Sequence, residues 1–182
     1  MTESRAYLQK YAMKYGTYMG IFWIVKFILF PLGFTQPILS LLFIILTLGV
    51  PFLAYFLVKK YREEACGGYI RFTHALVFTI FMFMFASLLV AVAHYIYFTF
   101  IDHGFILNSY TELWKNLLIT TPGMETNKKI IEDTIETAQT LTPIRIVIQV
   151  LSWNVFWGTI LAFPIAMALM KKDNSEQNKP TL

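Results

Sequence analysis

The sequence predicts an all-α fold, a polytopic membrane protein with four transmembrane helices in an up-down bundle and a helical extracytoplasmic insert between helices 3 and 4. Hydrophobic residues make up 57% of the 182 positions and charged residues 14%. A soluble domain is closer to one half apolar and one quarter charged. The apolar excess lies in four long spans, and one large hydrophilic segment, residues 102–143, separates the third span from the fourth.

Each span is long enough to cross a bilayer, because ~30 Å of hydrocarbon takes about 20 helical residues. Pro31 is expected to end the first span, and Pro37 suits the first turn of the second. The spans are predicted, in order, at residues 11–31, 37–58, 70–101 and 144–170. Together they form a single domain over 1–172, and the polar residues 173–182 predict a disordered tail.

The insert is expected to form a helical hairpin over about 102–143. Ser109 and Glu112 have the spacing of a capping box, which predicts a short helix that begins there and ends near Leu118. A turn is predicted at Thr121–Gly123. A second helix is predicted over Asn127–Thr140, with apolar residues on one face and charged residues on the other.

Lysine and arginine placement predicts how the chain is threaded through the membrane. Basic residues gather at the N-terminus, in the loop after the second span and at the C-terminus, while the insert has three lysines against six acids. Cytoplasmic segments carry the excess of Lys and Arg. Both termini are therefore predicted to be cytoplasmic, with residues 102–143 on the outer side.

The same rule accounts for the net charge of +4, so no nucleic-acid partner is predicted. The single cysteine, Cys66, excludes an intrachain disulfide and a thiolate metal cluster. His74 and His94 are separated by ~30 Å along one helix and do not share a metal. The sequence shows no nucleophile–base motif or phosphate-binding loop, and no catalytic residue, cofactor or metal is predicted.

Polar residues inside the spans are the candidate functional residues, because an ionisable group in lipid is costly and usually serves a function. Under the predicted threading, all of them fall in the outer half of the bilayer, beneath the insert. They are Lys26, His94, Arg145, Gln149 and Asn154. We expect a polar pocket that opens outward, with the hairpin as its lid, and that receives a lipid headgroup or an anionic lipid-linked substrate.

Each of these residues also has a simpler structural interpretation. Lys26 would snorkel to the outer headgroups, and His94 would be a hydrogen-bonded interior histidine. Arg145 would bind lipid phosphate at the interface, and Asn154 would join two helices. Gly16 and Gly20 have the spacing of a helix-packing face, within the chain or between chains.

Three stretches carry a resemblance to a known family. They are Tyr15-Gly16 at the first span, Gly67–Phe72 before the third span, and Tyr95–Asp102 at its end, followed by Gly123-Met124 and Thr142-Pro143. With these features the chain resembles the domain of unknown function 4199 family, small four-helix membrane proteins of Gram-negative bacteria. The resemblance implies an inner-membrane location, a periplasmic insert and a membrane glycosyltransferase as partner. It supplies no catalytic residues.

Three functions follow as hypotheses. The first is a non-enzymatic accessory or scaffold subunit for a membrane partner such as a glycosyltransferase. The second is a small transporter or flippase-like protein for a lipid or lipid-linked substrate, which would be a homo-oligomer because four helices enclose little space. The third is a membrane enzyme that uses His94 or Lys26.

Overall fold

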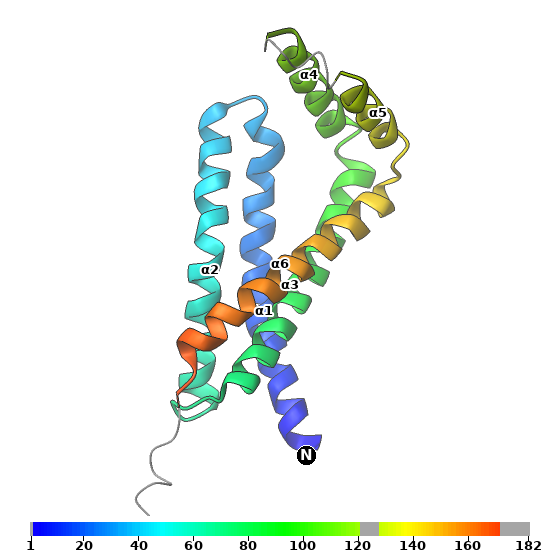
Figure 1. Cartoon of the computed structure of the whole chain (residues 1–182). Coiled ribbons are helices and arrows are strands. Elements are labelled where there is room, and N and C mark those ends of the chain that lie inside the picture. Colours follow the sequence, from blue (N-terminus) through cyan, green and yellow to red (C-terminus); the bar gives the residue numbers. More distant parts are fainter. Residues whose placement is uncertain (1, 121–127, 172–182) are drawn as a thin grey trace, which may run out of the picture.

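The computed structural model describes residues 2–120 and 128–171, and these residues form six helices (Figure 1). The helices are α1 (Thr2–Gly33), α2 (Pro37–Ala65), α3 (Phe72–Phe100), α4 (Phe105–Thr120), α5 (Lys128–Gln139) and α6 (Pro143–Leu169). The predicted all-α class is confirmed. The predicted turn at 121–123 and the tail at 173–182 lie outside the described residues.

Four of the helices, α1, α2, α3 and α6, are long and apolar enough to cross a membrane. Their apolar windows differ in how much of each is buried inside the protein: 44% for α3 but 17% for α6. A larger part of α6 than of α3 is therefore left uncovered by the protein, which in a bilayer means contact with lipid. The difference identifies α3 as the central helix of the bundle.

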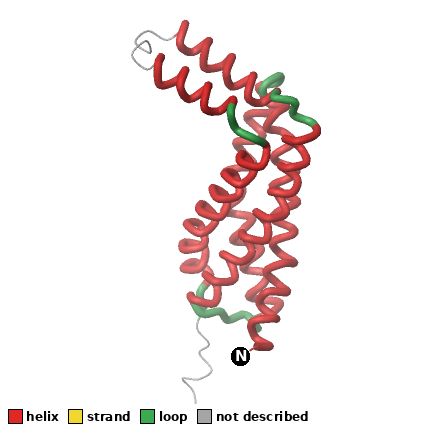
Figure 2. The backbone as a smooth tube through the Cα atoms, turned by 90° about the vertical axis from the view of Figure 1, so that its right-hand side faces the viewer, coloured by secondary structure: helices red, strands yellow, loops and turns green. Residues whose placement is uncertain are grey.

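The path of the chain alternates between two ends of the molecule. In Figure 1, α1 runs from the N-terminal end to the opposite end, α2 returns, α3 runs back, and α6 returns again after the α4–α5 hairpin. Figure 2 shows the hairpin projecting from the end opposite the N-terminus, at an angle to the long helices. We call this end the hairpin end, and the other the terminal end.

Glycines let α1 and α6 approach α3 closely. A Cβ added at Gly16 would lie 2.8 Å from both the Met82 carbonyl oxygen and the Phe85 Cβ atom. One added at Gly158 would lie 2.8 Å from the Cβ and Cγ atoms of Phe83. Small residues of this kind allow helix backbones to pack tightly where no hydrophobic effect drives association. Gly16 thus serves a packing face within the chain.

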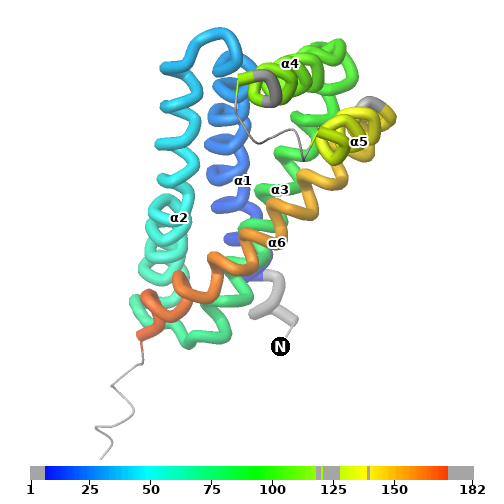
Figure 3. Tube along the Cα trace, turned by 45° about the horizontal axis from the view of Figure 1, so that its top comes forward, coloured from blue at the N-terminus to red at the C-terminus, as the bar shows by residue number. Residues whose placement is uncertain are grey.

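The second helix is buried only in the half that lies toward the terminal end. Its buried residues all lie in its second half: Val50, Ala54, Leu57, Val58 and Tyr61. At the end of α6 the Arg62 guanidinium donates a 3.2 Å hydrogen bond to the Leu169 carbonyl oxygen, one of the carbonyls that a helix end leaves without an internal partner. Toward the hairpin end α2 and α6 diverge, as Figures 1 and 3 both show.

The first two long helices extend beyond the predicted spans, and Pro31 does not end the first of them. The first helix continues through Pro31 to Gly33, because a proline removes only one backbone donor and the last turn is closed by other bonds, such as Thr35 Oγ1 to the Leu32 carbonyl at 2.8 Å. At its other end the same helix begins at Thr2, before the expected start of the span near residue 11. The second helix extends seven residues beyond 58, to Ala65.

The start of the insert also differs from the prediction. Ser109 does not open a helix, because α4 already begins at Phe105. Asp102 caps it instead: its carboxylate accepts hydrogen bonds of 3.1 Å from the backbone N–H groups of Gly104 and Ile106. The chain reverses there through positive φ angles at His103 and Gly104, which places α4 across the end of the bundle.

We predict that Gly158→Ala destabilises the protein by about 1–3 kcal/mol, the usual cost of overpacking a close contact. Gly49→Ala is the matched control, because a Cβ there meets nothing within 4 Å, and alanine is the better helix former. The unfolding free energy measured in SDS titrations should fall for the first variant and hold or rise for the second. Equal stability of the two would contradict the packing described here.

Candidate functional site

The divergence of α2 from α6 leaves a cavity of about 230 Å³ among the four long helices. Every long helix contributes to its wall. The lining residues are Trp23, Lys26, Phe27, Phe30, Phe43, Val90, His94, Phe98, Val150 and Asn154. Three of the five sequence-predicted site residues, Lys26, His94 and Asn154, are therefore brought together in one site.

The other two predicted residues are placed elsewhere. Arg145 and Gln149 are exposed on α6 and do not line this cavity. Asn154 and Val150 are one helical turn apart and face the cavity. A sequence cannot show which face of α6 is turned inward, because that depends on the angle at which α6 crosses α3.

Lys26 lies deeper than the sequence suggested. Because α1 continues to Gly33, Lys26 is seven residues, about 10 Å along the axis, from that end. Its Nζ atom is 5.2 Å from the centroid of the Phe43 ring on α2, so the side chain extends across the cavity mouth. A cation over an aromatic face is stabilised by the ring quadrupole, but the ring does not neutralise the charge.

His94 is buried against the Phe27 ring, with ring centroids 4.0 Å apart. Neither of its ring nitrogens has a hydrogen-bond partner among the described residues. The interpretation of His94 as a hydrogen-bonded interior histidine is therefore not what the structure shows. A buried polar group without a partner costs about 1–3 kcal/mol.

Trp23 is a site residue that sequence reasoning missed. Its indole Nε1–H is buried without a partner among the described residues, and the side chain lines the same cavity. Its position three residues before Lys26, on the same helix face, is the signal that could have identified it. Trp23 and Lys26 are donors only, while the His94 ring and the Asn154 amide can each donate and accept.

The hairpin does not cover this cavity: none of the described residues of α4 and α5 lines it. Instead α4 packs on the tip between α1 and α2. Phe34 contacts Phe105 and Tyr110 with ring centroids 6.2 and 5.2 Å apart, and Phe30 also reaches Tyr110 at 6.2 Å. These aromatic contacts fix α4 to the tip, next to Phe30, which also lines the cavity.

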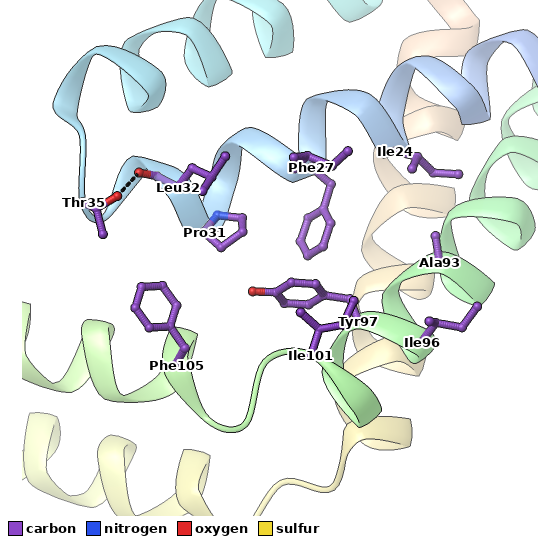
Figure 4. A pocket seen from close by; sticks show the side chains of 11 residues that line it. Ile24, Phe27, Pro31, Leu32, Thr35, Ala93, Ile96, Tyr97, Ile101 and Phe105 are labelled. Atoms are coloured by element: carbon purple, nitrogen blue, oxygen red, sulfur yellow. Dashed lines mark hydrogen bonds between the residues drawn. The ribbon is translucent and has the colours of Figure 1, made fainter.

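A second cavity, of about 510 Å³, lies between α1, α3 and the start of α4. Figure 4 shows its walls: Phe27, Pro31 and Leu32 on one side and Ile96, Tyr97 and Phe105 on the other. Its surface is almost wholly apolar. Phe27 lines both cavities, so this ring stands between a polar site and an apolar one that suits an acyl chain.

Another polar cluster lies at the terminal end. Glu64 accepts a 2.7 Å hydrogen bond from the Tyr15 hydroxyl and lies 3.4 Å from the Lys14 ammonium and 3.6 Å from that of Lys60. Nearby, the Tyr61 hydroxyl is 2.8 Å from His74 Nε2. These groups satisfy one another and join α1, α2 and α3, so they are structural.

Burial raises the pKa of the adjacent Cys66 thiol, which slows its alkylation.

The fold and the cavity define a class: an all-α, multi-pass membrane protein with a small polar site inside its bundle. The comparisons agree with the suspected resemblance. The family model described as protein of unknown function (DUF4199) matches residues 14–171, and the chain belongs to that family. Comparisons with curated proteins and with solved structures give no match.

We predict opposite effects for two histidine substitutions. His94→Phe removes two ring nitrogens that have no partner among the described residues and leaves an aromatic ring beside Phe27, so the unfolding free energy should hold or rise. His74→Phe removes the partner of Tyr61 and should cost about 1 kcal/mol. Unfolding of both variants in SDS titrations measures the difference. A larger loss for His94→Phe than for His74→Phe would show that His94 is a structural residue.

Proposed function

We infer that the protein is an inner-membrane protein of bacteria whose four spans form an up-down bundle, with cytoplasmic termini and residues 102–143 in the periplasm. The charge distribution supports this threading. The N-terminal part of α1, the α2–α3 loop and the end of α6 meet at the terminal end (Figure 1). Seven described basic residues of these segments and of the adjoining last turns of α2 therefore share one end, where positive charge favours the cytoplasm: Lys10, Lys14, Lys59, Lys60, Arg62, Arg71 and Lys171.

The role that the geometry supports best is that of an accessory subunit for a membrane partner. The observation that carries it is an apolar surface on the projecting hairpin. Leu113, Trp114 and Leu117 share one side of α4 and are 40–48% exposed, although α4 and α5 pack against each other. We call these three residues the hairpin surface. Exposed apolar side chains with an aromatic residue among them are typical of protein-binding sites.

The family resemblance suggests a membrane glycosyltransferase as that partner. A partner of this kind would contact the hairpin surface outside the bilayer and the exposed aromatic face of α6 inside it. That face consists of Trp153, Phe156, Trp157 and Phe163, which are all about half exposed.

A transporter of lipids or lipid-linked molecules is the second candidate. The observation that favours it is the position of the cavity lined by Trp23, Lys26, His94 and Asn154, which we call the polar cavity: it lies among the long helices, where α2 and α6 diverge (Figure 1). Transport requires the ligand to leave on the other side of the membrane, whereas an accessory subunit only binds. Lipid-flip assays in vesicles with the purified protein separate the two functions.

Impermeant maleimide labelling tests the threading. In a Cys66→Ser background, Glu132→Cys on α5 and Glu63→Cys near the end of α2 each place one exposed thiol. We predict labelling of Glu132→Cys in intact spheroplasts and of Glu63→Cys only after permeabilisation. The reverse pattern would overturn the orientation.

Photo-crosslinking tests the accessory role. We predict that benzoylphenylalanine at Trp114 forms an adduct with a membrane glycosyltransferase that mass spectrometry identifies. Glu112 lies two residues from Trp114, about 200° around α4 and therefore on its opposite side. Benzoylphenylalanine at Glu112 is the matched control and should give little adduct. Adducts with lipid alone, with a second copy of this chain, or equally at both positions would argue against the proposed role.

A further inference from the structure

The polar cavity brings together, on otherwise apolar walls, several nitrogen groups that can bind an anion. Trp23 and His94 are both more than nine-tenths buried, and the indole N–H and both imidazole nitrogens lack a hydrogen-bond partner among the described residues. Buried polar atoms in folded proteins are nearly always paired. Three unpaired atoms from two helices in one cavity therefore indicate a group that the cavity is built to bind.

The charge of the lining residues indicates that the bound group is an anion. Lys26 brings an ammonium, and among the described lining residues there is no Asp or Glu. The structure gives no ion pair to Lys26 within the described residues; its contact is the Phe43 ring at 5.2 Å. A cation held inside a membrane bundle needs a negative counter-charge, and donors outnumber acceptors around it.

The size and the position of the cavity further limit the kind of ligand that it can bind. At about 230 Å³ the cavity is smaller than the 300–1,000 Å³ typical of sites for whole drug-sized ligands, so it suits a headgroup rather than a complete lipid. It lies where α2 and α6 diverge (Figure 1), and a molecule with an acyl chain in the bilayer would enter sideways between these two helices. Arg145 and Gln149 are exposed on α6 near its start and lie toward the membrane surface from which such a headgroup would come.

We propose that this cavity, formed by Trp23, Lys26, His94 and Asn154, binds the phosphate of a lipid that enters between α2 and α6. The Lys26 ammonium and the Trp23 indole donate to the phosphate oxygens, and His94 and Asn154 complete the shell. The phosphate is held about 10 Å below the hairpin end of α1, the depth of Lys26, so this lipid differs from those that merely surround the bundle. The binding does not depend on any partner at the hairpin.

Native mass spectrometry of the full-length protein in detergent tests the proposal with defined probes. Phosphatidylglycerol supplies a lipid phosphate, diacylglycerol the same chains without phosphate, and inorganic phosphate the anion without chains. We expect phosphatidylglycerol to bind, diacylglycerol not to bind, and excess inorganic phosphate not to displace the lipid. Equal binding of diacylglycerol, or displacement by inorganic phosphate, would overturn the proposal.

Substitutions place the binding in this cavity. Lys26→Met keeps the length of the side chain and removes its charge. Lys26→Met should weaken phosphatidylglycerol binding by about tenfold or more, because the loss of one charge-assisted hydrogen bond has an effect of this size. Lys26→Arg keeps the charge and should retain binding. Lys115→Met, an exposed position on α4, is the matched control and should bind like wild type. If Lys26→Met does not fold, His94→Phe takes its place with the same expected loss. Wild-type affinity in the folded variant would contradict the proposed site.

Discussion

The rest of the structure depends on the close contact of α1 and α6 with the central helix α3. Gly16 and Gly158 permit that contact, because a Cβ at either position would lie 2.8 Å from α3 atoms. Water is absent from the bilayer interior, so the hydrophobic effect does not hold these helices together there, and packing at short range takes its place. Because α1 and α6 both pack on α3, α2 has a smaller share of the interface with α3. The bundle is consequently tight around α3 and loose where α2 meets α6.

That asymmetry explains why the polar residues lie where they do. At the terminal end Arg62 donates to the last turn of α6, and Glu64 pairs with two lysines and a tyrosine. Toward the hairpin end the helices separate, and Lys26, His94 and Asn154 surround the space between them. At the terminal end most polar groups pair within the chain, although Arg62 Nε is buried without a partner among the described residues. In the cavity the Trp23 indole nitrogen and both His94 ring nitrogens have no such partner, and this concentration makes the cavity the candidate site.

The sequence was sufficient for the four spans, since twenty apolar residues in a row have few other structures available. It was insufficient at Pro31, because hydrogen bonds around the last turn sustain a helix that a proline alone would end. It was also insufficient at Asp102, because the role of this residue as a cap depends on positive φ angles at the next two residues. Lys26, His94 and Asn154 were identified together with Arg145 and Gln149, although helical spacing places the last two on another face of the fourth span than Asn154. Which of those two faces is turned inward depends on how α6 packs against Phe83. Trp23 was missed although it lies one turn before Lys26 on the same helix face, because an aromatic residue in an apolar span gives no sign that its N–H has no partner.

The central claim is that α2 and α6 are joined at the terminal end and open at the hairpin end. Pulsed electron paramagnetic resonance in liposomes tests it most directly, in a Cys66→Ser background with spin labels at exposed positions. One pair, Leu41 and Ile148, reports on the hairpin end, and another, Phe56 and Met167, on the terminal end. The structure predicts a longer mean distance for the first pair than for the second. Equal distances, or a shorter one at the hairpin end, would show that the bundle is closed there and that the polar cavity does not exist in the membrane.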